Sequence, residues 1–134
     1  MKVMVCHDGS KNAQAALERT IELFRCERPE IILLTVVEEP LDATSVDEES
    51  FKKWHDKRDA DLKKAADWVA GHGVDVDALL AVGDPRKMIL EAVAAKKPDI
   101  LVVAKRGTSA LEHMVLGSVS AYIVRHSHCP VLIL

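Results

Sequence analysis

Two kinds of hydrophobic pattern alternate along the chain. Short apolar runs predict five strands, over residues 2–7, 31–37, 74–82, 100–104 and 130–134. Between these runs, apolar residues recur every three or four positions, as in helices that are buried on one side. Four helices are predicted: one that carries residues 13–24, one from about 49 to 70, one from 85 until Pro98, and one over 118–126. Strands that alternate with helices predict an α/β domain with a parallel sheet covered by helices.

Residues suited to helix starts support this pattern. Ser10 or Asn12 can cap the first helix, and Asp84 followed by Pro85 is a strong start for the third. In the second helix we interpret Trp54 as a packing residue rather than a platform for a nucleobase. The length of 134 residues and the lack of an internal repeat predict a single domain over residues 1–134.

Composition narrows the class of protein. Hydrophobic residues make up 49% of the chain and charged residues 29%, which is ordinary for a globular domain. The formal net charge of −3 argues against a nucleic-acid partner. No apolar run reaches the length of a membrane span and no export signal is evident, so we predict a cytoplasmic protein that contacts no membrane. Three dispersed cysteines, Cys6, Cys26 and Cys129, are expected to be reduced thiols.

The stretch before the last predicted helix carries the clearest candidate chemistry. Gly107 is followed by nine residues and then by Gly117 and Ser118. A helix start offers unpaired N–H groups and the positive end of the helix dipole, and glycines let the backbone approach an anion. Ser118 adds a hydroxyl, and Lys105 and Arg106 add positive charge, so we predict a phosphate site. A plainer alternative makes the glycines turn residues and Ser118 a simple N-cap.

Other candidate residues lie at the ends of predicted strands. Right-handed crossovers bring the carboxyl ends of parallel strands to one edge of the sheet. Asp8, Val37, Gly83 and the pair Ala104–Lys105 are therefore expected to gather there. Ligands of open α/β sheets bind at this edge, where the strand order reverses.

Three segments carry a resemblance to a known family. They read VMVCHDGS near the start, GDPRKMIL in the middle, and AKRGTSALEHMVLGSVSAYIVRHSHCPVLIL at the end. The chain resembles the universal stress protein family nearly end to end, and the last segment is by far the most specific. The resemblance implies a five-stranded parallel sheet in the order 3-2-1-4-5 with helices on both faces, a Rossmann-like fold of the adenine nucleotide alpha hydrolase type. Some members of this family bind ATP through a G-x2-G-x9-G-(S/T) motif.

The resemblance implies a role for each matching residue. The second motif glycine falls on Gly107, the third on Gly117 and the hydroxyl on Ser118, and Val119 and Ser120 complete the family's GSVS sequence. In the family this loop wraps the phosphates of the nucleotide, where Arg106 would also meet phosphate charge.

The resemblance also assigns residues to the adenosine part of the nucleotide and to the first glycine of the motif. Asp8 corresponds to an acidic residue that lies near the adenosine, and Val36–Val37 to a segment whose backbone meets adenine. The first motif glycine is Ala104 here. The added methyl costs little if the backbone is extended, and about 1 kcal/mol or more if φ is positive or the ligand is in close contact.

These residues lead to three hypotheses for function. The first is a nucleotide-dependent switch in stress response that binds ATP, with Mg²⁺ as a candidate bridging ion. The second is a dimeric interaction module that binds no nucleotide. The third is an enzyme, but no base that could activate water stands out, so we expect slow ATP hydrolysis at most. The resemblance also implies a homodimer that pairs through the last strand, Pro130 to Leu134.

Two further groups of residues have the side chains of a metal site or a catalytic pair, but not the expected arrangement. His126, His128 and Cys129 are metal-ligand types, but their spacing is too tight for a usual zinc site, so no metal site is predicted. Cys6 and His7 are adjacent in a strand and point to opposite faces, so we do not expect them to cooperate in catalysis.

Overall fold

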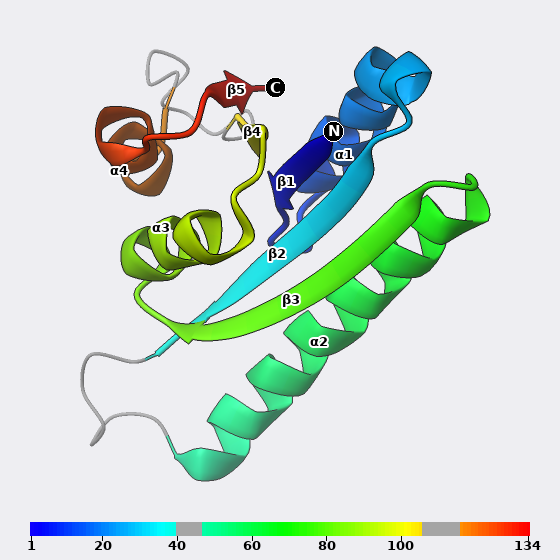
Figure 1. The fold of residues 1–134 in the computed structure, drawn as a ribbon. Helices are drawn as coiled ribbons and strands as arrows, with labels where there is room; N and C mark the ends of the chain where they lie inside the picture. Colours follow the sequence, from blue (N-terminus) through cyan, green and yellow to red (C-terminus); the bar gives the residue numbers. More distant parts are fainter. Residues whose placement is uncertain (40–46, 106–115) are drawn as a thin grey trace.

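A computed structural model describes residues 1–39, 47–105 and 116–134 of the chain. Strands and helices alternate along it as the hydrophobic pattern predicts (Figure 1). The elements are β1 (Lys2–Cys6), α1 (Lys11–Phe24), a short 3-10 helix η1 (Arg25–Glu27), β2 (Glu30–Glu38), α2 (Glu48–Gly71), β3 (Asp75–Gly83), α3 (Pro85–Lys96), β4 (Ile100–Val103), α4 (Ser118–His126) and β5 (Val131–Ile133).

The five strands form one parallel sheet in the order β3-β2-β1-β4-β5, which confirms the fold expected from the resemblance. Strand β1 lies at the centre, with β2 on one side and β4 on the other. The chain first builds outward through β2 and β3 and then returns to the other side of β1. The carboxyl end of β1 is therefore the point where the strand order reverses.

Alternate residues of the central strands supply two hydrophobic layers, one on each face of the sheet. One layer combines odd-numbered residues of β1 and β2 with α1 and α2: Val3, Val5, Leu17, Ile31, Leu33, Leu62, Ala65, Val69 and Val102. The other combines even-numbered residues of these strands with α3 and α4: Met4, Ile32, Leu34, Ile89, Leu101, Val103 and Ile123. The sheet is thus covered on both faces, as predicted.

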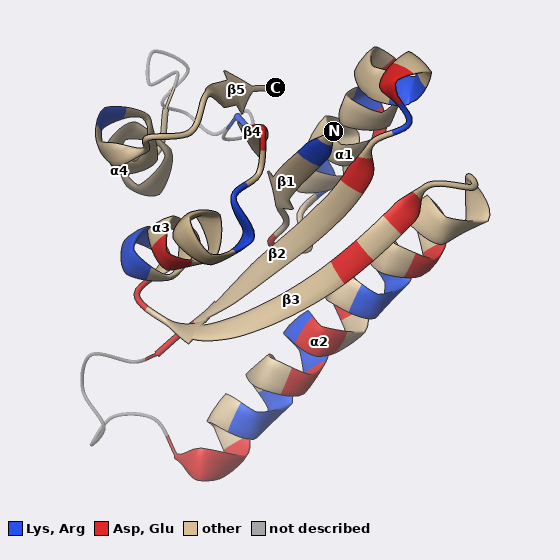
Figure 2. Cartoon of the chain, viewed as in Figure 1, with Lys and Arg blue, Asp and Glu red and all other residues tan. Residues whose placement is uncertain are grey.

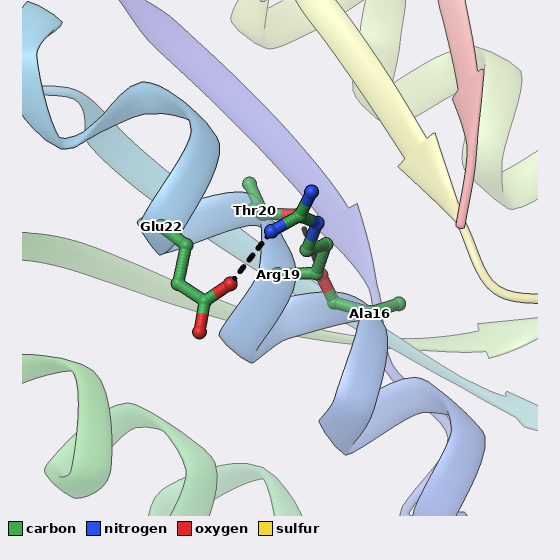
Figure 3. Close-up of polar contacts among 4 residues, drawn as sticks. All are labelled: Ala16, Arg19, Thr20 and Glu22. Atoms are coloured by element: carbon green, nitrogen blue, oxygen red, sulfur yellow. Dashed lines mark hydrogen bonds and ion pairs between the residues drawn. The ribbon is translucent and has the colours of Figure 1, made fainter.

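Helix α1 shows how one helix serves both core and solvent. Thr20 is fully buried, and its hydroxyl donates to the carbonyl oxygen of Ala16 (2.7 Å), one turn earlier (Figure 3). A buried hydroxyl with a partner avoids most of the penalty for burying a polar group. On the exposed side, Arg19 pairs with Glu22 at 2.9 Å (Figure 3). Such an exposed pair contributes about 0–1 kcal/mol, so the helix is held mainly by its buried side.

Helix α2 is the longest helix, and charges of both signs alternate along it (Figure 2). Its buried residues are Leu62, Ala65 and Val69, which pack under the sheet. The helix runs through Gly71, and the chain then leaves it at Gly73, whose φ is +71°. Glycine adopts this left-handed conformation without strain, so Gly73 rather than Gly71 ends the helix.

Strand pairing continues past the ends of β1 and β4. The N–H of His7 donates to the carbonyl of Leu34 (2.8 Å), and the N–H of Lys105 donates to the carbonyl of Leu134 (2.6 Å). The N–H of Leu134 in turn donates to Val103 (3.1 Å). The backbone around these ends is therefore held in extended geometry, and they make a firm rim at one edge of the sheet. No helix in the described part of the chain has the length and apolar character needed to cross a membrane.

Candidate functional site

A cavity of about 590 Å³ lies at the carboxyl edge of the sheet, beside the end of β1. Residues that follow β1 and β4, residues near the end of β2, and residues of all four helices form its walls. This volume is within the range of small-molecule sites, roughly 300–1,000 Å³. The cavity is thus at the strand-order reversal where the sequence predicted a ligand site.

The turn between β1 and α1 forms one wall of the cavity. The N–H of Ser10 donates to Oδ1 of Asp8 (2.9 Å), and Oγ of Ser10 accepts from the N–H of Ala13 (3.1 Å). Ser10, one of the two predicted candidates, is therefore the N-cap of α1, and Asn12 is not. Gly9 lies between them with φ of +82°. This left-handed conformation favours glycine, and a β-carbon at Gly9 would also come within 2.5 Å of Oδ2 of Asp61 in α2, so that side chain would have to move.

Asp8 lies in the cavity wall and its carboxylate is held in the charged form. Burial acts to raise the pKa of Asp8, but hydrogen bonds from Ser10 and the positive charge of Arg58 outweigh it, so the pKa is lowered from 3.8. Asp8 thus both braces the turn and presents an anionic acceptor to the cavity.

His7 and Cys6 lie beneath this turn and also line the cavity. Nδ1 of His7 accepts from the N–H of Gly9 (3.2 Å), so Nε2 carries the proton that faces Oε1 of Gln14 at 3.3 Å. Burial, and then the negative charge of Asp8, raise the pKa of the Cys6 thiol to about 12. A thiol that stays protonated at neutral pH is a poor nucleophile.

The start of α4 forms the opposite wall. Gly117 is the N-cap residue, with φ of −68° and ψ of 167°, and no side chain caps the helix. The alternative in which Ser118 is the N-cap is therefore wrong: Ser118 is the first helical residue and its side chain is exposed. Gly117, Val119 and Ser120 line the cavity, whereas Ser118 is not part of its lining.

The first backbone N–H groups of α4 are potential hydrogen-bond donors to a ligand. The first intrahelical bond runs from the N–H of Ala121 to the carbonyl of Gly117 (2.9 Å). The N–H groups of residues 118–120 precede that bond and have no acceptor within the helix. They carry the positive end of the helix dipole, which favours an anion at this wall of the cavity.

Ala104 and Lys105 line the cavity between these two walls. In the described chain, positive φ among residues other than glycine occurs at Arg28 and Lys97, so Ala104 carries no such strain. The carbonyl of Lys105 accepts from Nδ2 of Asn12 (3.1 Å), which ties the rim of β4 to the start of α1. Lys105 is exposed and its positive charge belongs to the cavity lining.

Strand β2 contributes a third wall through one side of its length. Leu34, Val36 and Glu38 line the cavity, whereas Val37 is fully buried and does not. Alternation along a strand explains the difference, because Val37 points to the face that α1 and α2 cover. Val36 is thus the member of the predicted pair whose side chain reaches the cavity.

Sequence reasoning missed the part that α2 plays. Trp54 and Arg58 line the cavity, although Trp54 was interpreted as packing alone. Trp54, Arg58 and Leu62 follow one another at four-residue spacing, so they lie on one stripe of the helix. An arginine in an otherwise apolar stripe is the signal that this stripe leaves the core and meets a polar space.

Two of the predicted site residues, Arg106 and Gly107, lie outside the described residues. Within the described ranges, no three side chains of the His, Cys, Asp and Glu types come together in a way that could hold a metal ion. The sulfur of Cys129 instead lies 3.4 Å from the carbonyl oxygen of Pro98.

Comparison with known proteins identifies the family of this chain. The family model described as universal stress protein family matches residues 1–134. The universal stress protein YxiE of Bacillus subtilis is 32% identical over 98% of this chain and 97% of its own length.

Two solved structures of similar proteins hold adenine nucleotides. An Arabidopsis thaliana universal stress protein family protein with AMP bound is 28% identical, with a TM-score of 0.72 over 100% of this chain and 90% of its own. A universal stress protein in complex with cAMP is 27% identical, with a TM-score of 0.75 over 100% and 95% of the two chains. The match of the family model to the whole chain, together with the fold, shows that this protein belongs to the universal stress protein family.

Proposed function

We propose that this protein binds ATP in the cavity at the carboxyl edge of its sheet and acts as a nucleotide-dependent switch in stress response. The observation that carries the proposal is the helix start without a side-chain cap at Gly117, which opens onto a cavity of about 590 Å³. Similar proteins bind AMP and cAMP, which supports an adenine nucleotide as the ligand.

The phosphates would bind between α4 and the end of β4. The N–H groups of residues 118–120 have no acceptor within the helix, and the positive end of the helix dipole lies at this end of α4. Lys105 and Ser120 belong to the cavity lining. Backbone donors, a hydroxyl and a cation together suit a polyanion. In this proposal Gly107 and Arg106 complete the phosphate site from the neighbouring loop, and Mg²⁺ bridges the phosphates.

The nucleoside would lie on the other side of β1. The ionised carboxylate of Asp8 can accept from a ribose hydroxyl, and the segment at Val36 and Val37 can meet the base through its backbone. Ala104 is compatible with this arrangement because its backbone is held in extended geometry by the pairing of its neighbours with Leu134. The methyl group therefore costs affinity only if it contacts the ligand.

Calorimetric titration with ATP, with and without Mg²⁺, tests the proposal. We expect a dissociation constant in the micromolar range and weaker binding of adenosine, which lacks the phosphates. The variant Ala104→Gly, which restores the motif glycine, is expected to bind as tightly or several-fold more tightly. Absence of heat for both proteins at high micromolar ATP would overturn nucleotide binding and favour the interaction module.

We also propose a homodimer formed through β5. This strand is one edge of the sheet and pairs only with β4 among the described strands. The backbone groups of Pro130 and Leu134 face β4, so by alternation those of Val131 and Ile133 face outward. An unpaired apolar edge of this kind is a template for a second strand.

Removal of one outward donor tests the dimer. Ile133→Pro deletes an N–H at the free edge and leaves the pairing with β4 intact, whereas Ile133→Val keeps the donor. We expect a dimeric mass for wild type and Ile133→Val at tens of micromolar in analytical ultracentrifugation, and a shift toward monomer for Ile133→Pro. A monomeric wild type at this concentration would refute the dimer, but not ATP binding.

The cytoplasmic location stays a prediction.

A further inference from the structure

We propose that Trp54 of α2 is the aromatic contact for the nucleoside of the bound nucleotide, so that helix α2 distinguishes a nucleotide from a plain polyphosphate. The inference rests on the proposed nucleotide site and adds to it a residue from a helix outside the family motif. Three observations carry it: the place of Trp54 in the cavity wall, the way it is held, and its position relative to the phosphate end.

Trp54 lies where a core residue would lie but faces the cavity. It belongs to the stripe of α2 that continues through Leu62 and Val69, which are both buried. Trp54 itself is half-buried and lines the cavity. The ring of Phe51 packs edge-on against it, with centroids 6.4 Å apart and planes 80° apart. A partly exposed indole held by an edge contact can present a π-surface to a flat ligand.

The position of Arg58 beside Gly9 locates the indole of Trp54 along the cavity. Its guanidinium is close to Gly9, because a β-carbon built there would lie 3.3 Å from Nη1. No carboxylate of the described residues is within ion-pair distance of Arg58, although the charge of Asp8 is near enough to interact with it. Trp54 lies four residues before Arg58, which is about one helical turn, or about 6 Å along the helix axis. The indole therefore lies beyond the Asp8 turn, toward the amino end of α2.

The strand order separates this wall from the phosphate end. Helix α2 packs against β2 and β3, on one side of β1, whereas α4 starts after β4 on the other side (Figure 1). Val36 and Glu38 of β2 also line the cavity, from the face of the sheet that α3 and α4 cover. A ligand with its phosphates at α4 and its ribose at Asp8 would thus bring its base to Trp54.

The two tryptophans of the chain make the contact measurable. Trp68 packs against the hydrophobic layer under the sheet and is absent from the cavity lining. In a Trp68→Phe background, all indole fluorescence comes from Trp54. We expect ATP to quench or shift this emission with saturation, and sodium tripolyphosphate to bind with little change in it.

Affinities of the variants test the energetic role. We expect Trp54→Ala to weaken ATP and GTP binding by about tenfold each, because stacking on an aromatic ring tolerates any base. Tripolyphosphate affinity should change by less than about twofold, and Trp54→Phe should recover most of the ATP affinity. The Trp68→Phe protein is the matched control for loss of an indole.

Each outcome separates the two proposals. If wild type binds ATP and Trp54→Ala binds it equally well, the contact is refuted while nucleotide binding stands. If Trp54→Ala weakens ATP and tripolyphosphate by the same factor, general damage to the site explains the loss and the inference is also refuted. If wild type binds no adenine nucleotide, the proposed function fails and the inference fails with it.

Discussion

Helices α1 and α4 both start at the rim of the same cavity, but their first turns are completed in different ways. At the start of α1, the hydroxyl of Ser10 accepts from the N–H of Ala13, and the carboxylate of Asp8 accepts from the N–H of Ser10. At the start of α4, Gly117 offers no side chain, and no side chain of the described residues caps the helix. The first turn of α1 thus has a side-chain acceptor next to it in the sequence, whereas the first turn of α4 has none among the described residues.

The proposed phosphate site depends on this difference. An N-cap side chain contributes about 0.5–2 kcal/mol to stability, so a helix without one forgoes that contribution. Gly117, Val119 and Ser120 line the cavity, so the start of α4 lies at its wall. In the proposal the backbone donors of this helix start bind the phosphates, whereas the start of α1 is capped by its own side chain.

Filling the missing cap should have the largest effect. Gly117→Asp would supply a carboxylate to the free donors and place a negative charge where the phosphates are proposed to bind. We expect ATP affinity to fall by about 100-fold, since like charges in contact cost several kcal/mol. Gly117→Asn is the matched control, because it can cap without charge and should lose much less affinity. Equal ATP affinity of the two variants in calorimetry would remove the phosphates from this helix start.

A change in the turn between β1 and α1 should reduce the free energy of unfolding. Gly9→Ala forces a β-carbon onto φ of +82° and against Asp61, so we expect a loss of about 2 kcal/mol in the free energy of unfolding. Gly71→Ala is the control: nothing lies within 4 Å of its β-carbon position, and alanine favours a helix by about 0.5–1 kcal/mol. Urea unfolding of both variants measures the contrast. An unchanged Gly9→Ala midpoint would show that the turn relaxes freely.

The charge of Asp8 should have the smallest effect, with a defined pH dependence. The pKa of Asp8 is lowered in the folded protein from 3.8, so its charge stabilises the fold at neutral pH. That contribution is lost as pH falls below about 4 and through the folded pKa. For this exposed side chain we expect Asp8→Asn to cost about 0.5 kcal/mol at pH 7.

The pH series supplies its own control. The difference between wild type and Asp8→Asn, measured by urea unfolding without nucleotide, should shrink steadily as the pH falls below about 4. A difference that stays constant from pH 7 to pH 3 would mean that the carboxylate charge plays no part and that only the side-chain shape matters.

Most of the fold follows from local signals in the sequence. Asp84 was predicted as a cap and Ser10 as one of two candidates with Asn12, and both Ser10 and Asp84 are observed as caps. A short polar side chain before an apolar period favours a helix start there. The start of α4 was placed one residue late in the alternative that made Ser118 its cap. Glycine and serine can both occupy an N-cap, and only the backbone geometry separates them.

The site was less predictable than the fold. Asp8 and Ala104 could be placed at the cavity because parallel strands end at one edge of the sheet, and Gly117 because it precedes the last predicted helix. Trp54 and Arg58 could not, because their role depends on where α2 lies beside β2 and on which stretch of its stripe passes beyond the core. A hydrophobic stripe records which residues face inward, but not whether a strand or an open space lies opposite them.

The Cys6 thiol at the cavity wall also gives covalent labelling a use as a report on cavity occupancy. Because burial raises its pKa to about 12, Cys6 reacts slowly with an electrophile at pH 8, whereas the exposed Cys26 reacts readily. A ligand that fills the cavity lined by Cys6 would slow the labelling of Cys6 further without altering the labelling of Cys26.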